Sequence, residues 1–248
     1  MMGIFDKLMG GNTLYYPGCL TKFVMKNLQD NYEKILRRCG IDFIKLKDME
    51  VCCGSPTHNA GYERDFKTLA RKNLEVFKRH GVKKIITSCP ACYKTFSKDY
   101  KGLLGDEWDI EVEHATQTII KALEKGRLKI KNPAKKERLT YHDPCHLGRH
   151  SGIYDEPRKI LEKLGYEIVE MDNSRENAMC CGGGGGVRSN YPELSSAITK
   201  DVLKEAQKTK TFVLTTTCPM CDACFIQAAK DSKMAVKELS ELIVERIE

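Results

Sequence analysis

The 248-residue sequence lacks any run of 18 consecutive apolar residues, which predicts no direct membrane span. It also lacks a basic and then apolar leader, because residues 1–12 read MMGIFDKLMGGN, which predicts no secretory signal. We therefore expect a cytoplasmic protein whose thiols stay reduced. In that setting the 12 cysteines favour metal or redox chemistry over a disulfide framework.

The positive charge of the chain is concentrated in one segment that lacks aromatic residues. The formal net charge is +7, and residues 121–138 hold eight basic and two acidic side chains, which leaves the rest of the chain almost neutral. One short basic segment that contains a proline is typical of a solvated connection between domains. We therefore expect no nucleic-acid partner.

The sequence repeats itself. YYPGC ending at Cys19 matches YHDPC ending at Cys145, EVCCG matches AMCCG, and ITSCPACYKTF matches TTTCPMCDACF, at offsets of 126, 128 and 129 residues. These matches indicate a tandem duplication. The predicted division is an N-terminal segment (1–11), a first cysteine-rich domain (12–126), a basic linker (127–137) and a second cysteine-rich domain (138–248).

Strand and helix signals alternate within each copy. In the first copy, residues 12–16, 41–46 and 83–88 predict strands. Residues 22–38, with apolar side chains at 24, 28, 32, 35 and 36, and residues 61–81 predict helices. This alternation predicts an α/β fold, built as two Rossmann-like parallel-sheet halves with pseudo-two-fold symmetry. The cysteine motifs then lie in loops at the carboxyl edge of each sheet.

Ten of the cysteines follow one pattern used twice. The pattern is Cys, about 33 residues, Cys-Cys-Gly, about 36 residues, and Cys-x-x-Cys. The other two cysteines differ from it. Cys39 aligns with a leucine at the end of a predicted helix and reads as a small buried apolar residue, whereas Cys224 lies one helical turn beyond Cys221.

Three chemistries compete for each set of five cysteines. Structural zinc needs four tetrahedral ligands, which an adjacent Cys-Cys pair plus a fifth cysteine fits poorly. A thioredoxin-like dithiol needs one Cys-x-x-Cys and leaves three thiols unexplained. Iron–sulfur chemistry fits best, because several thiolates gathered by one cluster of loops suit soft multi-iron sites.

VCCGS, MCCGGGGG, CPAC, CPMC and YHDPCHLGRHSGIYDEPRKIL resemble the motifs of the CCG-type cysteine-rich iron–sulfur proteins. The similarity is to the B-type subunit of heterodisulfide reductase and to the CCG domain of its D-type subunit, over about residues 12–247. The resemblance implies two noncubane 4Fe–4S clusters. The first would be held by Cys19, Cys52, Cys53, Cys89 and Cys92, and the second by Cys145, Cys180, Cys181, Cys218 and Cys221.

The resemblance implies a catalytic subunit that reduces a disulfide of the coenzyme M–coenzyme B type or similar, or oxidises thiols, within a larger complex. An electron-transfer subunit that links a lactate, glycolate or glycerol-3-phosphate dehydrogenase to a quinone stays open, as does a cluster- or zinc-bearing scaffold. The sequence shows no ferredoxin motif and no flavin fingerprint. We therefore expect a ferredoxin-like iron–sulfur partner, together with a flavoprotein or a membrane-anchor subunit that would associate the chain with a membrane.

Polar groups gather only around the second motif. His146 is the predicted catalytic acid, because thiolate products need protons near neutral pH. Arg149 and Arg188 are predicted to bind an anionic group of the substrate. Gly183 and Gly184, within a five-glycine run, would let backbone N–H groups approach substrate or cluster. This run is no nucleotide fingerprint, so no nucleotide is expected.

Overall fold

The structure is a computed structural model that describes residues 11–46, 49–131 and 136–248. The predicted N-terminal segment, apart from Gly11, and residues 132–135 of the predicted linker lie outside the described residues. The described part of that linker pairs with the end of the chain: the Lys131 backbone N–H donates to the Arg246 carbonyl (2.8 Å), and that of Glu248 to the Lys129 carbonyl (3.3 Å).

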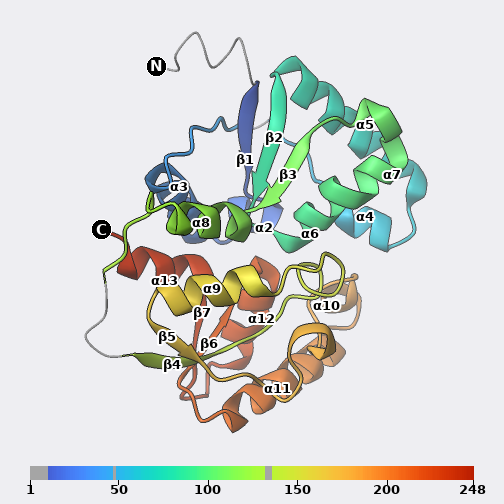
Figure 1. The fold of residues 1–248 in the computed structure, drawn as a ribbon. Coiled ribbons are helices and arrows are strands. Elements are labelled where there is room, and N and C mark those ends of the chain that lie inside the picture. The colour runs from blue at the N-terminus through green and yellow to red at the C-terminus, as the bar shows by residue number, and fades with distance from the viewer. Residues whose placement is uncertain (1–10, 47–48, 132–135) are drawn as a thin grey trace.

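The first half of the chain forms a three-stranded parallel sheet in the order β1-β2-β3, with helices on both faces (Figure 1). Its elements are β1 (Asn12–Tyr16), α2 (Cys19–Phe23), α3 (Lys26–Arg38), α4 (Ser55–Asn59), α5 (Glu63–Arg79), β2 (Val82–Thr87), α6 (Pro90–Lys94), the π-helical η2 (Thr95–Asp99), α7 (Tyr100–Leu104), the 3₁₀ turn η3 (Gly105–Glu107), β3 (Glu111–His114) and α8 (Ala115–Glu124).

The second half forms a four-stranded parallel sheet in the order β5-β4-β6-β7. Its elements are β4 (Glu137–Tyr141), α9 (Asp155–Lys163), β5 (Tyr166–Ile168), the 3₁₀ turn η4 (Arg175–Asn177), α10 (Val187–Asn190), α11 (Pro192–Lys208), β6 (Val213–Thr216), α12 (Pro219–Ala228), β7 (Ala235–Glu238) and α13 (Leu239–Arg246). The predicted duplicated α/β fold is confirmed, because β1, β2 and β3 correspond in sequence to β4, β6 and β7.

Two local predictions for the first half are wrong. The segment predicted as a strand over 41–46 makes only a single parallel bridge, Leu14 to Ile44, where the second half has β5. The helix predicted over 22–38 is divided into α2 and α3, and Val24 lies between them, 71% exposed. The apolar positions at 28, 32, 35 and 36 are buried as expected, because they share one face of α3.

The two halves pack through equivalent helices. Helix α3 packs on α13, and α8 packs on α9. The sequence repeat relates α3 to α9 and α8 to α13. Each of the two contacts is therefore the symmetry equivalent of the other, as a pseudo-two-fold axis requires. Figure 1 shows α8 of one half facing α9 and α13 of the other. One apolar core crosses this interface and includes Tyr32, Ile119, Leu161 and Ile243. The relative position of the two cysteine sets is therefore set by a buried interface.

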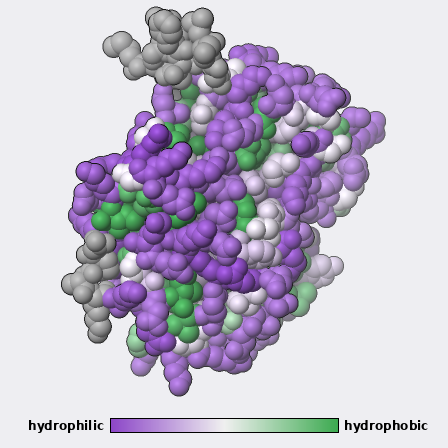
Figure 2. All heavy atoms as spheres, viewed as in Figure 1, coloured by the Kyte–Doolittle hydropathy of each residue, from purple (hydrophilic) through white to green (hydrophobic). Residues whose placement is uncertain are grey.

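Each sheet also has an apolar core of its own on its other face. The core of the first half contains Phe77, Phe96 and Trp108, whose rings contact one another. Polar residues cover most of the face of the molecule seen in Figure 2, and apolar residues show there as smaller areas. No helix in the described ranges has the length and apolar content needed to cross a membrane.

Candidate metal centre

The five cysteines of the first half come together from three segments beyond the carboxyl ends of the strands. Cys19 is the first residue of α2, Cys52 and Cys53 precede α4, and Cys89 is the N-cap of α6, which contains Cys92. Hydrogen bonds connect their thiols in the order 19–52–53–92–89, and the Sγ atoms of Cys92 and Cys53 lie 3.3 Å apart.

The second half repeats this arrangement. Its thiols connect in the order Cys145–Cys180–Cys181–Cys221–Cys218, and the Sγ atoms of Cys221 and Cys181 lie 3.1 Å apart. Hydrogen bonds from the two neighbouring thiols hold the pKa of Cys180 well below its usual range, as they do for Cys52. The two sets therefore match in connectivity as well as in sequence spacing.

The glycine of each Cys-Cys-Gly motif has a conformational role. Gly54 and Gly182 both adopt a left-handed backbone, with φ of 85° and 80°. Their N–H groups donate to the Sγ of Cys52 and Cys180, each at 3.4 Å. A Cβ on Gly182 would approach the Ser195 carbonyl oxygen to 2.8 Å, so a larger residue would displace this turn.

The chemistry of the donors fits an iron–sulfur cluster in each half. All twelve cysteines are free thiols, and each set supplies five soft donors with a backbone N–H beside them. Among the residues that the structure describes, no three or more histidine, cysteine, aspartate or glutamate side chains are arranged around a single metal ion. The fit therefore lies in the type, number and proximity of the donors.

The two cysteine outliers have different surroundings. Cys39 caps the C-terminus of α3 within the core between the halves, where burial raises the pKa of its thiol to about 12. Cys224 is also buried, but it hydrogen-bonds Cys181 and accepts a hydrogen bond from Arg188. Cys39 is thus a core residue, and Cys224 adjoins the second set.

Histidines lie on both sides of Cys145. Nδ1 of the half-buried His146 lies 3.4 Å from the Cys145 Sγ. Burial lowers the pKa of His146, and the charges of His150 and Lys94 add to this effect. His142 is buried, and its Nε2 lies 2.9 Å from the Met179 carbonyl oxygen.

The predicted substrate-binding residues do not share one environment. Arg149 donates to the backbone carbonyls of Ala178 (2.5 Å) and Glu176 (3.2 Å), and so contacts the segment that leads to Cys180. Arg188 reaches helix α12 instead. A Cβ on Gly183 would lie 2.8 Å from the Cys224 Sγ, whereas one on Gly184 would meet no atom within 4 Å.

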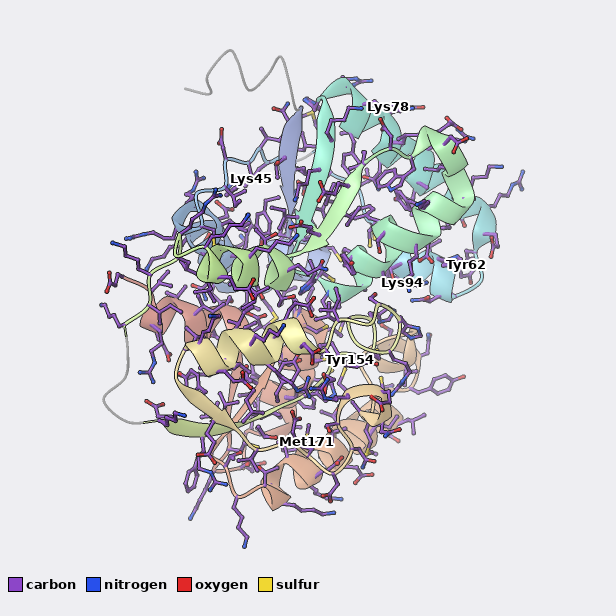
Figure 3. The ribbon with its side chains drawn as sticks, viewed as in Figure 1. Lys45, Tyr62, Lys78, Lys94, Tyr154 and Met171 are labelled. Carbon is purple, nitrogen blue, oxygen red and sulfur yellow. The ribbon has the colours of Figure 1, made fainter. Side chains whose placement is uncertain are left out.

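The two cysteine sets lie within electrostatic reach of each other across the interface between the halves. A hydrogen bond with Cys221 and burial raise the pKa of Cys218, and the charge of Cys89 in the other half raises it further. The Lys98 ammonium donates to the His150 carbonyl at 2.6 Å. In Figure 3, Lys94 of the first half lies at the border with the second half.

Sequence reasoning missed a buried ion-pair network behind the second set. Arg158 donates to both carboxylate oxygens of Asp143 (2.8 Å each) and to Glu170 (2.6 and 2.9 Å), and its side chain is only 6% exposed. Asp143 also accepts from the Arg175 backbone N–H at 2.8 Å. The acidic residue within YHDPC was the available signal, but the identity of its partner depends on the tertiary fold.

Two equivalent parallel sheets, each with five thiols beyond its strand ends, define a duplicated cysteine-rich α/β protein. Residues 13–97 and 139–226 each match the CCG family, the cysteine-rich domain. The chain belongs to this family. The two matches fall one in each half, in agreement with the duplication.

Several known proteins are similar over most of the chain. It is 35% identical over 240 residues to the D-type subunit of the dihydromethanophenazine:CoB–CoM heterodisulfide reductase of Methanosarcina barkeri, covering 94% of this chain and 58% of that one. It is 35% identical to an EtfAB:quinone oxidoreductase of Syntrophomonas wolfei (84% and 30% covered) and 34% identical to a probable iron–sulfur-binding oxidoreductase of Bacillus subtilis (77% and 27%). The chain thus spans little more than half the length of the first of these relatives.

Proposed function

We propose that each half holds one noncubane 4Fe–4S cluster and that the chain is the catalytic iron–sulfur subunit of a heterodisulfide reductase-like complex. The observation that carries this proposal is the matching order of five connected thiols in the two halves. The proposed ligands are the ten repeated cysteines, with 12–126 and 138–248 as the cluster-bearing domains joined by 127–137. The names of the relatives support iron–sulfur chemistry.

The proposed reaction breaks the sulfur–sulfur bond of a small disulfide, of the coenzyme M–coenzyme B type or similar. The disulfide takes up two electrons and two protons and yields two thiols, and thiol oxidation is the reverse. An iron–sulfur cluster, when bound, supplies electrons one at a time and an iron that stabilises a thiolate. Because the charge of Cys89 in the first half affects the pKa of Cys218 in the second, we expect each product sulfur to lie beside the thiols of one half.

His146 is the proposed proton donor. Its ring lies beside Cys145, and the backbone carbonyl of His146 accepts from the Ser151 hydroxyl at 2.6 Å, which ties this residue into its turn. Arg149 and Arg188 supply positive charge for an anionic substrate group, and Gly183 and Gly184 keep the loop backbone open. All of these residues belong to the second half, so we place the substrate there.

The proposed partners supply electrons. They are a ferredoxin-like iron–sulfur subunit and a flavoprotein or membrane-anchor subunit, with the chain itself on the cytoplasmic side. A second candidate function is an electron-transfer subunit between a dehydrogenase and a quinone. The relative named EtfAB:quinone oxidoreductase favours that alternative, because its similarity covers 84% of the chain.

Electron paramagnetic resonance on the anaerobically purified chain distinguishes these functions. A signal that changes when a thiol substrate is added to the oxidised protein supports catalysis. Clusters that can be reduced and oxidised, but whose signal does not change when a thiol is added, support electron transfer. A chain that carries zinc, or clusters that do not respond to reductant, supports a scaffold and contradicts both redox functions.

A further inference from the structure

The second cysteine set has a sixth thiol that the first set lacks. Cys224 lies one turn beyond Cys221 on α12, is 4% exposed and hydrogen-bonds Cys181. The equivalent residue in the first half is Thr95, which is buried at the start of the π-helical turn η2. The two sets therefore differ at one buried position directly beside a proposed ligand.

Arg188 fixes a positive charge over this thiol. Its Nη1 lies 3.3 Å from the Cys224 Sγ and 3.9 Å from the Met220 Sδ, and its Nη2 lies 3.0 Å from Gln227 Oε1. Residues 220, 224 and 227 share one face of α12, because they are four and then three positions apart. The guanidinium thus lies along that face, with its orientation set by three contacts.

Gly183 allows the glycine loop to pack against Met220 and Cys224. A Cβ at this position would lie 2.7 Å from the Met220 Cγ and 2.8 Å from the Cys224 Sγ. The equivalent residue in the first half is Ser55, which is buried at the start of α4. The loop that carries Arg188 therefore packs on α12 in a way that a side chain at position 183 would prevent.

We propose that Arg188, acting through Cys224, is a positioning residue that makes the second cluster the more easily reduced of the two. A positive charge held beside buried sulfur stabilises the negative charge that reduction adds. The reduction potentials of clusters respond to nearby charge and to hydrogen bonds on sulfur. Electrons would then collect in the half that carries His146. This inference rests on the proposed function, since it requires a cluster in each half.

The test is a redox titration, followed by electron paramagnetic resonance, of the full chain with its clusters. In Arg188→Gln, the reduced-to-oxidised ratio of the second cluster at fixed potential should fall about tenfold, which equals 59 mV for one electron. The first cluster and the iron content should not change. Arg138→Gln is the matched control, because it removes one positive charge from the second half at an exposed pair with Glu167.

A double-mutant cycle shows whether Arg188 acts through Cys224. With Cys224→Ser in place, the effect of Arg188→Gln should shrink to about threefold or less. Arg188→Lys keeps the positive charge but loses the planar guanidinium. The reduction potential of its second cluster should lie between those of the wild type and Arg188→Gln. A purely structural role would not give this graded series of potentials.

The contrary outcomes are distinct. Equal shifts in Arg188→Gln and Arg138→Gln, or no shift in either, would overturn the inference and leave the proposed function standing. Iron lost from the second half in both Arg188→Lys and Cys224→Ser would show that the pair holds the site together, which also overturns the inference. A wild-type chain that binds no iron under anaerobic conditions would overturn the proposed function as well.

Discussion

The two halves carry the same ion pair with its charges exchanged. In the first half, Glu33 on α3 accepts from Lys45 at 2.8 Å, and at the equivalent positions of the second half Arg158 on α9 donates to Glu170 at 2.6 Å. Lys45 reaches outward in Figure 3, and its side chain is 36% exposed. Arg158 is buried because it also pairs with Asp143. The two halves thus share an equivalent contact. In the second half this contact also connects, through Asp143, the segments that carry Cys145 and Cys180.

The surroundings of the first cysteine in each set differ as well. Helix α2 begins at Cys19 and ends with Phe23 (70% exposed), which Val24 (71% exposed) follows. After Cys145 the chain instead folds into turns that bury Leu147 and bring His146 over the thiol. Cys19 therefore lies beside exposed apolar side chains suited to a protein surface, whereas Cys145 lies beside a histidine suited to a small molecule, which supports the unequal roles proposed above.

The largest expected effect comes from variants that remove the iron of one half at a time. Cys53→Ser should remove the iron of the first half and Cys181→Ser that of the second, because each is a buried central member of its thiol chain. Each variant should retain about half of the wild-type iron by metal analysis. Cys39→Ser is the control and should retain all of it. If either central variant loses iron from both halves, the two sites are not independent.

The exchanged ion pairs should differ in their contribution to stability. Arg158→Met should lower the free energy of unfolding by about 3–5 kcal/mol, because it leaves the Asp143 carboxylate buried without its partner. Glu33→Gln removes the corresponding exposed pair and should cost less than about 1 kcal/mol. Denaturant unfolding of the full chain measures both. Equal losses would mean that the network around Asp143 does not anchor the second half.

His146→Asn tests the assignment of the proton donor to the second half. Loss of a general acid should slow disulfide or thiol turnover by about 10²-fold. Both clusters should remain present and reducible by electron paramagnetic resonance. His150→Asn changes an exposed neighbouring histidine and serves as the control. Full turnover in His146→Asn would remove this residue from the reaction, and loss of the second cluster would make its role structural.

The smallest effect concerns two equivalent helix caps, His114 on α8 and Glu238 on α13. Burial raises the pKa of Glu238 to about 7, despite hydrogen bonds from Ser240 and Tyr32. The folded protein therefore binds this proton more tightly than the unfolded chain does. The contribution of Glu238 to stability is full below about pH 4 and is lost as the pH rises through 7.

Glu238→Gln should thus gain stability relative to the wild type, by about 2 kcal/mol, as the pH rises from 5 to 8. His114 should behave oppositely, because burial lowers its pKa to about 3 and its contribution is lost as the pH falls below about 6.5. His114→Gln should therefore reduce the loss of stability in acid. Thermal unfolding over this pH range measures both variants, and parallel curves for the wild type and Glu238→Gln would contradict the account.

Sequence patterns predicted the elements whose signals are local and strong. The helix over 61–81 appears as α5, and each Cys-Pro-x-Cys begins a helix with its first cysteine as N-cap, because proline suits the first turn. The prediction of a strand over 41–46 is wrong, because this segment lies at the edge of the sheet and bridges β1 only at Ile44. The contacts of Arg158 and Arg149 lie beyond sequence patterns, since they join residues brought together only by the fold.

The most direct test of the central claim, one cluster in each half, is metal analysis of the anaerobic wild-type chain. We predict about eight iron atoms per chain, four for each cluster, with no zinc. About four iron atoms, with zinc bound in the other half, would contradict the claim of one cluster in each half. The two equivalent thiol sets would then serve different chemistries, and the proposed disulfide cleavage by two clusters would fail.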